Sequence, residues 1–220
     1  MSLRKYLTTI YKRKNFFDPT KNYSHIPQKL IIKYRNKKII NIGSGEEPLG
    51  DKVITLDRYT KSDIKANAIS LPIKSNSFDL ALSIAVLEHL KEPSQAIDEM
   101  CRILKPGGQV YIEIPFLQPF HSSPHDYFRA TLPGLKHWCR QFKEIDSGVC
   151  VGSGSTVSWI MIEYTRLFFS QIPFIGLLVE LGVRAISLPL KYLDKLIINQ
   201  PNSHFSASAI YFHGQNPAKK

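Results

Sequence analysis

The chain has 220 residues, 43% of them hydrophobic, and its 29 Lys or Arg against 18 Asp or Glu give a formal net charge of +11 at neutral pH. This length predicts one folded domain with elaborations rather than two domains. The three cysteines are widely spaced and form no CxxC pair, which argues against a disulfide framework or a cysteine zinc site and favours a reducing, cytoplasmic compartment.

Most of the excess positive charge lies in a basic arm of residues 1–38. Eleven Lys or Arg but only one acidic residue, Asp18, precede Ile39, so the remainder of the chain is nearly neutral. Such arms bind anionic lipid or nucleic acid in some proteins and are solvated tails in many others. The arm lacks the uninterrupted apolar stretch of a secretory signal, and we expect a short helix near residues 30–34.

Two short apolar runs follow the arm, and each ends in residues typical of a nucleotide site. Residues 39–42 predict a first strand that stops at Gly43-Ser44-Gly45, and residues 53–56 predict a second strand that stops at Asp57. Glycines at a strand end let the backbone approach a ligand closely, and a carboxylate at the next strand end accepts hydrogen bonds from ribose hydroxyls. The pattern therefore predicts a nucleoside-containing cofactor at the edge of a parallel sheet.

The next elements are a buried strand, a helix and another strand. Residues 80–84 form a continuous apolar run, typical of a strand buried on both faces. A helix is predicted from Pro93, with apolar residues at helical spacing up to Leu104. Residues 105–108, Lys-Pro-Gly-Gly, are expected to stop that helix, and residues 109–114 to form the next strand.

The last third of the chain is rich in large apolar residues. Residues 157–167 and 172–198 predict helices broken by Pro173 and Pro189, and residues 206–212 predict a closing strand. Charged residues interrupt both apolar segments, which argues against a transmembrane span. Together with the basic arm, the apolar segments permit contact with the surface of an anionic membrane.

This order of motifs resembles the class I S-adenosylmethionine-dependent methyltransferases, and in particular the type 11 family. The resemblance covers residues 39–145 and is carried by the glycine turn, Asp57, and three later motifs: Ser77-Phe78-Asp79, Leu87-Glu88-His89-Leu90 and Arg102-Ile103-Leu104-Lys105-Pro106-Gly107-Gly108. It implies an α/β fold with a Rossmann-like, mostly parallel sheet and helices on both faces. Separately, the apolar composition of the last third predicts a helical lid inserted before the last strand. The corresponding segments are residues 1–38 (basic arm), 39–155 (S-adenosylmethionine-binding core), 156–204 (lid) and 205–220 (closing strand and tail).

The resemblance also implies which residues contact the S-adenosylmethionine cofactor. These are Asn41, Gly43, Ser44, Gly45, Asp57, Asn67, Ala68 and Ile84. Three positions depart from the family pattern: Asn41 and Asn67 stand where acidic residues are common, and Glu47 replaces a third glycine. Asp57 as an exposed turn acid and Asn67 as an Asx-turn former are the structural alternatives.

The loop after the strand at 109–114 contains the predicted catalytic residues. His125 is the expected general base, assisted by Asp126 and His121, because an imidazole beside a carboxylate suits proton removal. Substrate contacts are expected from Tyr127, Arg129, Glu88 and His89. Similar segments occur in family members that act on sugars or cell-surface glycans.

Two structural alternatives and a metal alternative remain open for these residues. In the first, Asp126 pairs with Arg129 and pins the loop while the histidines line a pocket; in the second, residues 88–89 simply begin a helix. His121, His125 and Asp126 together could also ligate a metal, but Pro124 argues against a helical histidine pair, so no metal is predicted.

The predicted function is methyl transfer from S-adenosylmethionine to an oxygen or nitrogen of a small-molecule, sugar, glycan or lipid-linked acceptor. A nucleic-acid methyltransferase is the first alternative, suggested by the basic arm. Residues 84–87, Ile-Ala-Val-Leu, lack the Pro-Pro motif that amino-methylating enzymes often carry there. A non-catalytic binding module that keeps the fold is the second alternative.

Overall fold

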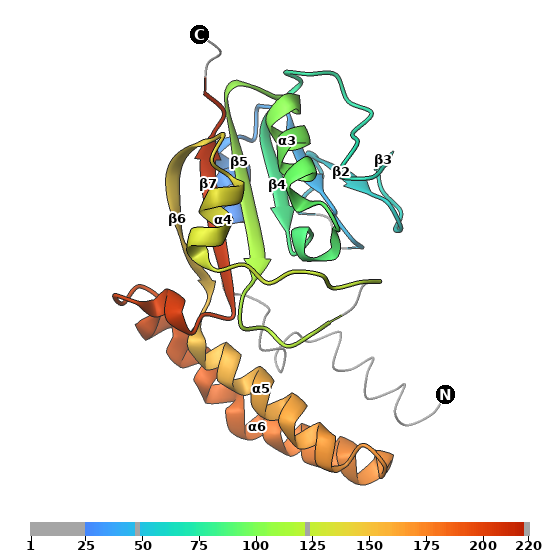
Figure 1. The fold of residues 1–220 in the computed structure, drawn as a ribbon, viewed down its shortest axis with the longest axis vertical. Coiled ribbons are helices and arrows are strands. Elements are labelled where there is room, and N and C mark those ends of the chain that lie inside the picture. Colours follow the sequence, from blue (N-terminus) through green and yellow to red (C-terminus); the bar gives the residue numbers. More distant parts are fainter. Residues whose placement is uncertain (1–24, 47–48, 122–123, 218–220) are drawn as a thin grey trace. The chain divides into compact units, whose positions relative to one another are not determined.

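The computed structural model describes residues 25–46, 49–121 and 124–217 (Figure 1). Most of the basic arm, residues 1–24, and Glu47 lie outside these ranges. The chain divides into two compact units, which are described separately. The sheet unit contains Ser24–Phe116, Phe120–Gly148 and Ala209–Lys220, and the hairpin unit contains Leu117–Pro119 and Val149–Ser208.

A seven-stranded sheet organises the sheet unit, in the order β3-β2-β1-β4-β5-β7-β6. The strands are β1 (Ile39–Ile42), β2 (Val53–Asp57), β3 (Ile64–Lys65), β4 (Phe78–Ile84), β5 (Leu104–Pro115), β6 (Lys143–Val151) and β7 (Ala209–Gln215). The strands from β3 to β5 pair in parallel, and β7 runs antiparallel to β5. The predicted mostly parallel α/β sheet is therefore confirmed.

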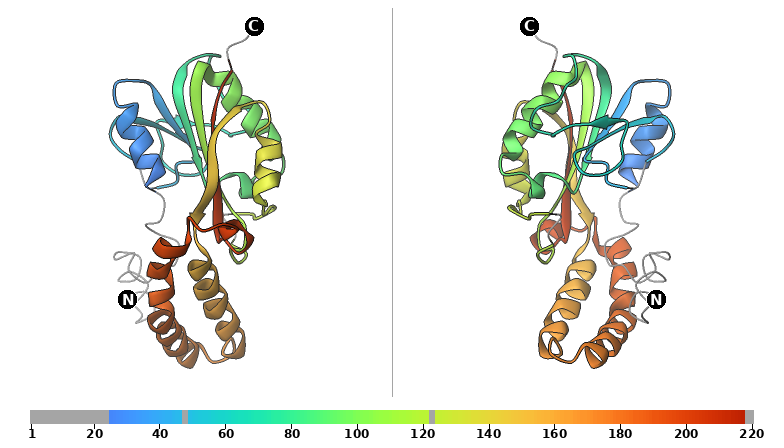
Figure 2. Two further views of the ribbon diagram at one scale, coloured as in Figure 1. Left: turned by 90° about the vertical axis from the view of Figure 1, so that its left-hand side faces the viewer. Right: turned by 90° about the vertical axis from the view of Figure 1, so that its right-hand side faces the viewer.

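The central strands are apolar because they are covered on both faces. Every residue of β1 is buried, and β1 lies between β2 and β4. Helix α2 (Ile26–Lys33) covers one face of the sheet, and α3 (Pro93–Ile103) and α4 (Leu132–Trp138) cover the other (Figure 2). Parallel sheets require this double cover, because their strands have no solvated face.

The junction between α3 and β5 differs from the prediction. Leu104 is the first residue of β5 rather than the last of the helix, and it is completely buried. The glycines at 107–108 lie inside β5, where the pairing with β4 shifts register between Phe78 and Leu80. Gly107 has a φ of +82°, so these glycines form a bulge in a strand rather than a turn between a helix and a strand.

Helices α5 (Ser153–Phe168) and α6 (Pro173–Ile197) run side by side in the hairpin unit (Figure 2). Pro173 begins α6, but Pro189 lies inside this helix and does not end it, contrary to the prediction. Packing along α5 offsets the roughly 3 kcal/mol that an interior proline costs a helix. A short helical turn, η2 (Ser203–Phe205), precedes β7, which begins three residues after the predicted closing strand.

Small and polar side chains form the contact between the two helices. Asp194 accepts hydrogen bonds from the backbone of Gly154 (2.6 Å) and from the backbone and hydroxyl of Ser155 (3.0 and 2.7 Å). Ser158 and Ser187 are buried and joined by a 2.7 Å hydrogen bond. Among the described residues, none of the helices combines the length and apolar composition that crossing a membrane requires.

Candidate active site

The turn after β1 requires glycine at its first position. Gly43 has a φ of +72°, and a Cβ atom added there would lie 2.4 Å from a methyl group of Val86. Its backbone N–H donates a 2.7 Å hydrogen bond to the carbonyl of Leu56, so the turn is tied to β2. Gly45, with a φ of +58°, has no neighbour within 4 Å of such a Cβ atom. The backbone is thus closely packed at Gly43 and open at Gly45.

Asp57 ends β2 and holds the following turn. Its Oδ1 accepts hydrogen bonds from the backbone N–H groups of Tyr59 (2.7 Å) and Thr60 (2.8 Å), and its Oδ2 accepts one from Gly45 (3.0 Å). Burial alone would raise the pKa of Asp57, but the hydrogen bonds from Thr60, Tyr59 and Gly45 outweigh it and lower the pKa below its usual value. Asp57 is therefore a buried, ionised carboxylate rather than an exposed turn acid.

Thr60 was not predicted from the sequence, although it joins the two strand ends. Its hydroxyl donates a 2.9 Å hydrogen bond to the carbonyl of Gly45. The signal was available in principle, because an aspartate accepts hydrogen bonds from backbone groups two and three residues on in an Asx turn.

Two buried polar side chains beside this turn have unsatisfied hydrogen-bonding atoms. Asn41 is 4% exposed and its Oδ1 has no hydrogen-bond partner among the described residues. The hydroxyl of Ser44 is also buried and has no hydrogen-bond partner among the described residues. Buried polar atoms without partners are rare in folded proteins and indicate a place for a polar ligand or ordered water.

A cavity of about 660 Å³ opens beside the glycine turn, a volume typical of small-molecule sites. Of the predicted cofactor residues, the cavity is lined by Gly43, Gly45, Asp57, Asn67 and Ala68. The other three, Asn41, Ser44 and Ile84, are not part of the lining, but Ala85 and Val86, which follow Ile84, are. Asn67 Oδ1 also accepts a 3.3 Å hydrogen bond from the backbone of Ile69, as expected for an Asx turn.

Two segments that follow β4 and β5 also line the cavity. His89 belongs to the short helix η1 (Leu87–His89), and His125 and Tyr127 belong to the loop after β5. The two aromatic rings of this loop lie 5.4 Å apart, centroid to centroid. The structure therefore brings the predicted base, His125, to the same cavity as the glycine turn and Asp57.

Asp126 binds Arg129. Both oxygens of Asp126 accept hydrogen bonds from the guanidinium of Arg129, and one also accepts a 2.9 Å bond from the backbone N–H of His121. Burial opposes ionisation, but the bonds from Arg129 and His121 lower the pKa of Asp126 below its usual value. In the described residues no hydrogen bond joins Asp126 to the His125 imidazole. This is the ion pair of the loop-pinning alternative.

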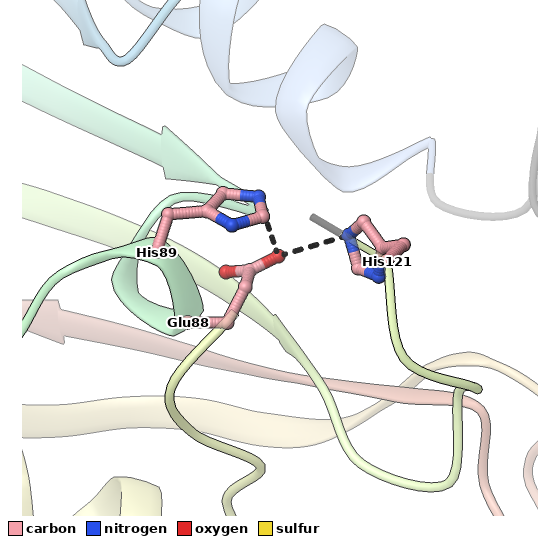
Figure 3. Close-up of side chains that lie close together, drawn as sticks. All are labelled: Glu88, His89 and His121. Carbon is pink, nitrogen blue, oxygen red and sulfur yellow. Dashed lines mark ion pairs between the residues drawn. The ribbon is translucent and has the colours of Figure 1, made fainter. Parts of the chain in front are cut away.

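Glu88 is completely buried. No other described residue donates a hydrogen bond to either carboxylate oxygen. One of these oxygens lies 3.8 Å from Nε2 of His89 and 3.8 Å from Nε2 of His121 (Figure 3). Burial raises the pKa of Glu88 to about 8. Glu88 and His121 do not line the cavity; of this trio only His89 does.

Comparison with known proteins finds similarity to methyltransferases. The family model described as "Methyltransferase domain" matches residues 50–112. The tRNA U34 carboxymethyltransferase of Campylobacter fetus is 28% identical over 102 residues, which cover 40% of this chain and 36% of that protein. The demethylmenaquinone methyltransferase of Renibacterium salmoninarum is 33% identical over 75 residues, which cover 33% of this chain and 32% of that protein.

The solved structures agree on the fold. A SAM-dependent methyltransferase of Thermotoga maritima has a TM-score of 0.55 at 15% identity, covering 96% of this chain and 97% of that one. At this identity the likeness concerns the fold alone. The chain spans about a third of the length of the two curated relatives, so its substrates do not follow from theirs.

Proposed function

We propose that the chain is a class I S-adenosylmethionine-dependent methyltransferase, and that it transfers a methyl group from S-adenosylmethionine to an oxygen or nitrogen of an acceptor. The match to the methyltransferase domain model and the fold support this proposal. The observation that carries the proposal is the shared cavity. Gly43, Asp57, His125 and Tyr127 all line it. A donor and an acceptor bound in one cavity react as if at very high local concentration.

The residues of the glycine turn fit the cofactor. An ionised carboxylate offers about four lone-pair sites. Three backbone N–H groups use three of these sites on Asp57, so the carboxylate can still accept a hydrogen bond from a ribose hydroxyl. The unsatisfied atoms of Asn41 and Ser44 suit the polar methionine part. The bound cofactor would supply a methyl group already activated by its positive sulfur, so the protein's tasks are alignment and proton removal.

His125 is the residue that we propose as general base. Its imidazole lines the cavity, and histidine is the side chain that most often serves as general base in enzymes. The Asp126–Arg129 pair would position it indirectly, by fixing the loop on which it sits. Tyr127, which is 40% exposed, would pack against the acceptor, and an aromatic surface of this kind suits a sugar ring or another flat apolar face.

Calorimetric titration with S-adenosylhomocysteine tests the cofactor site. We expect binding by the wild-type protein and a loss of at least about tenfold in Asp57→Ala, since at least one charge-assisted hydrogen bond is removed. Absence of wild-type binding, or unchanged binding in the variant, contradicts the assignment.

Methyl transfer from labelled cofactor to cell extracts tests the base. His125→Ala should lose transfer by about 10²-fold or more while keeping S-adenosylhomocysteine affinity. The matched control is His137→Ala, an exposed histidine on α4, which should keep transfer. Mass spectrometry of the labelled product would identify the acceptor, for which a sugar, glycan or lipid-linked hydroxyl is our first proposal.

A lipid-linked acceptor is favoured by the unusual surface of the hairpin unit. Its interhelical contact is small and polar, whereas large apolar side chains such as Leu167 (74% exposed), Phe168 (66%) and Leu196 (70%) face outward. Extended exposed apolar surface is unfavourable in water and marks a protein or membrane contact. Small and polar residues at the helix contact are typical of helix pairs in lipid. We therefore propose that the hairpin lies on a membrane surface.

Liposome flotation tests this contact. The wild-type protein should float with vesicles that contain anionic lipid, and Leu167→Glu/Phe168→Glu should not, because two charges replace the apolar contact. Ile32→Glu, at a residue that is 65% exposed on α2, is the control and should float. Equal flotation of the double variant and the wild type contradicts the proposal.

A nucleic-acid acceptor is the second candidate. It is suggested by the tRNA-modifying relative and by the net charge of +11. RNA binding that weakens steeply with added salt, together with methyl transfer to RNA, would favour it over the lipid-linked acceptor.

A further inference from the structure

The ionised form of the buried Glu88 carboxylate is poorly stabilised by the described residues around it. The side chain is completely inaccessible to solvent, and no other described residue donates a hydrogen bond to its oxygens. An ionised carboxylate without partners costs several kcal/mol or more to bury. The Arg129 guanidinium, a nearby cation, is engaged by Asp126.

Two imidazoles converge on one oxygen of this carboxylate. Nε2 of His89 and Nε2 of His121 each lie 3.8 Å from Glu88 Oε1, beyond hydrogen-bond distance. Figure 3 shows both rings turned toward the carboxylate from separate segments. All three ligand atoms lie within 4.8 Å of one another. The arrangement leaves a small space bounded by two nitrogens and one oxygen.

The outer nitrogen of each ring is oriented by a second group. Nδ1 of His89 lies 2.5 Å from the carbonyl oxygen of His125. A carbonyl only accepts, so Nδ1 carries the proton, and in the neutral ring Nε2 presents its lone pair toward Glu88. Nδ1 of His121 lies 3.3 Å from Arg129 Nη2, which can only donate, and 3.8 Å from Asp126 Oδ2. Metal-binding histidines typically donate their second N–H to an acceptor, as His89 does, so His121 would have to carry its proton on Nδ1, toward Asp126, to bind a metal through Nε2.

We propose that Glu88, His89 and His121 bind a zinc ion. Two imidazoles and one glutamate are a ligand set of zinc sites that keep a fourth position open, whereas Mg²⁺ and Ca²⁺ prefer oxygen ligands alone. An ion in the plane of three atoms with these separations would lie at most about 2.5 Å from each, and an ion above that plane would lie farther away. Zinc bonds of about 2.0–2.2 Å would need inward shifts of a few tenths of an ångström.

The position of the site gives it a place beside the proposed reaction. Glu88 and His89 follow β4, and His121 lies in the loop after β5, so adjacent strand ends supply the ligands. His89 also lines the cavity that contains His125. The ion would therefore sit at the border of the acceptor side and fix the two segments that form it. This set differs from the ligands considered from the sequence, because His125 and Asp126 are not part of it.

Metal analysis of untagged protein tests the proposal without requiring activity. Protein stripped with a chelator and titrated with Zn²⁺ should bind one equivalent, measured by elemental analysis after gel filtration. Co²⁺ in place of Zn²⁺ should give visible absorption bands typical of four- or five-coordinate nitrogen and oxygen ligation. Wild-type protein that binds neither ion stoichiometrically overturns the proposal.

Variants locate the ion. Glu88→Gln and His121→Ala should each weaken Zn²⁺ binding by about 100-fold or more, and His137→Ala should bind like the wild type. If Glu88→Gln fails to fold, His121→Ala, at a side chain that is 32% exposed, still gives the answer. Wild-type affinity in a folded ligand variant overturns the site. Asp57→Ala should keep its zinc while losing S-adenosylhomocysteine, so failure of the cofactor site and failure of the metal site are distinguishable.

Discussion

Replacing Gly43 by alanine tests whether the glycine turn is required for close packing or only for backbone freedom. An alanine at the φ of +72° costs about 1–2 kcal/mol, because left-handed backbone brings Cβ close to the following carbonyl oxygen. The new Cβ would also lie 2.4 and 2.7 Å from the two methyl groups of Val86. Valine has few alternative rotamers, so relieving this overlap costs about 1–3 kcal/mol more. The sum is about 2–5 kcal/mol.

Gly45→Ala is the matched control, since it has a similar φ of +58° and nothing within 4 Å. Its free energy of unfolding should fall only by the cost of placing alanine in left-handed backbone, about 1–2 kcal/mol. The smaller entropy of the unfolded alanine chain affects both variants equally and cancels in their comparison. Equilibrium urea unfolding gives each free energy of unfolding.

The double variant Gly43→Ala/Val86→Ala completes the test. Removing the two methyl groups should restore about 1–2 kcal/mol relative to the sum of the single changes. Equal destabilisation by the two glycine changes, or strict additivity in the double variant, would refute the steric reasoning.

Three further changes have outcomes that unfolding experiments can check. The stability that Asp57 contributes over Asp57→Asn should be full above about pH 4 and shrink as pH falls, because its pKa is lowered below 3.8 in the folded protein; an equal difference at pH 2 and pH 7 contradicts this. Arg102→Lys should cost about 1–2 kcal/mol, since the guanidinium donates to the carbonyl of Leu71 (3.0 Å) and a second carbonyl at once; a wild-type urea midpoint would speak against it. Asp194→Ala should cost about 2–3 kcal/mol by leaving the donors of Ser155 buried without a partner, and a change below about 0.5 kcal/mol would show that water replaces the carboxylate.

The sequence predicted the central strands because their burial leaves a local signature. β1 and β4 are apolar along nearly their whole length, as strands covered on both faces must be. β6 was missed because an edge strand has no such run: it begins with Lys143 and is exposed over its first half. Leu104 was placed in the preceding helix because an apolar residue satisfies either element, and only the pairing with Phe78 decides for a strand.

The part of the candidate site that lies at the ends of adjacent strands could be predicted from the sequence. Gly43 and Asp57 follow adjacent strands, so their meeting at one cavity follows from the fold. The partner of Asp126 depends instead on the path of the loop, which brings Arg129 rather than His125 to the carboxylate. The burial of Glu88 was not visible either, because an acid that opens a helical turn is usually exposed.

The two buried carboxylates, Asp126 and Glu88, differ in how their charge is balanced, and the difference favours a cation beside Glu88. Asp126 and Arg129 cancel each other's charge and use the pairing to hold the loop. Glu88 is buried more deeply than Asp126, yet the basic groups 3.8 Å from its carboxylate are the imidazoles of His89 and His121, which do not carry a permanent charge. A lysine or arginine at either position would have closed the charge balance within the chain. Imidazoles balance it only when a proton or a metal ion joins them, and the second nitrogen of His89 already donates to a carbonyl as a metal ligand's does.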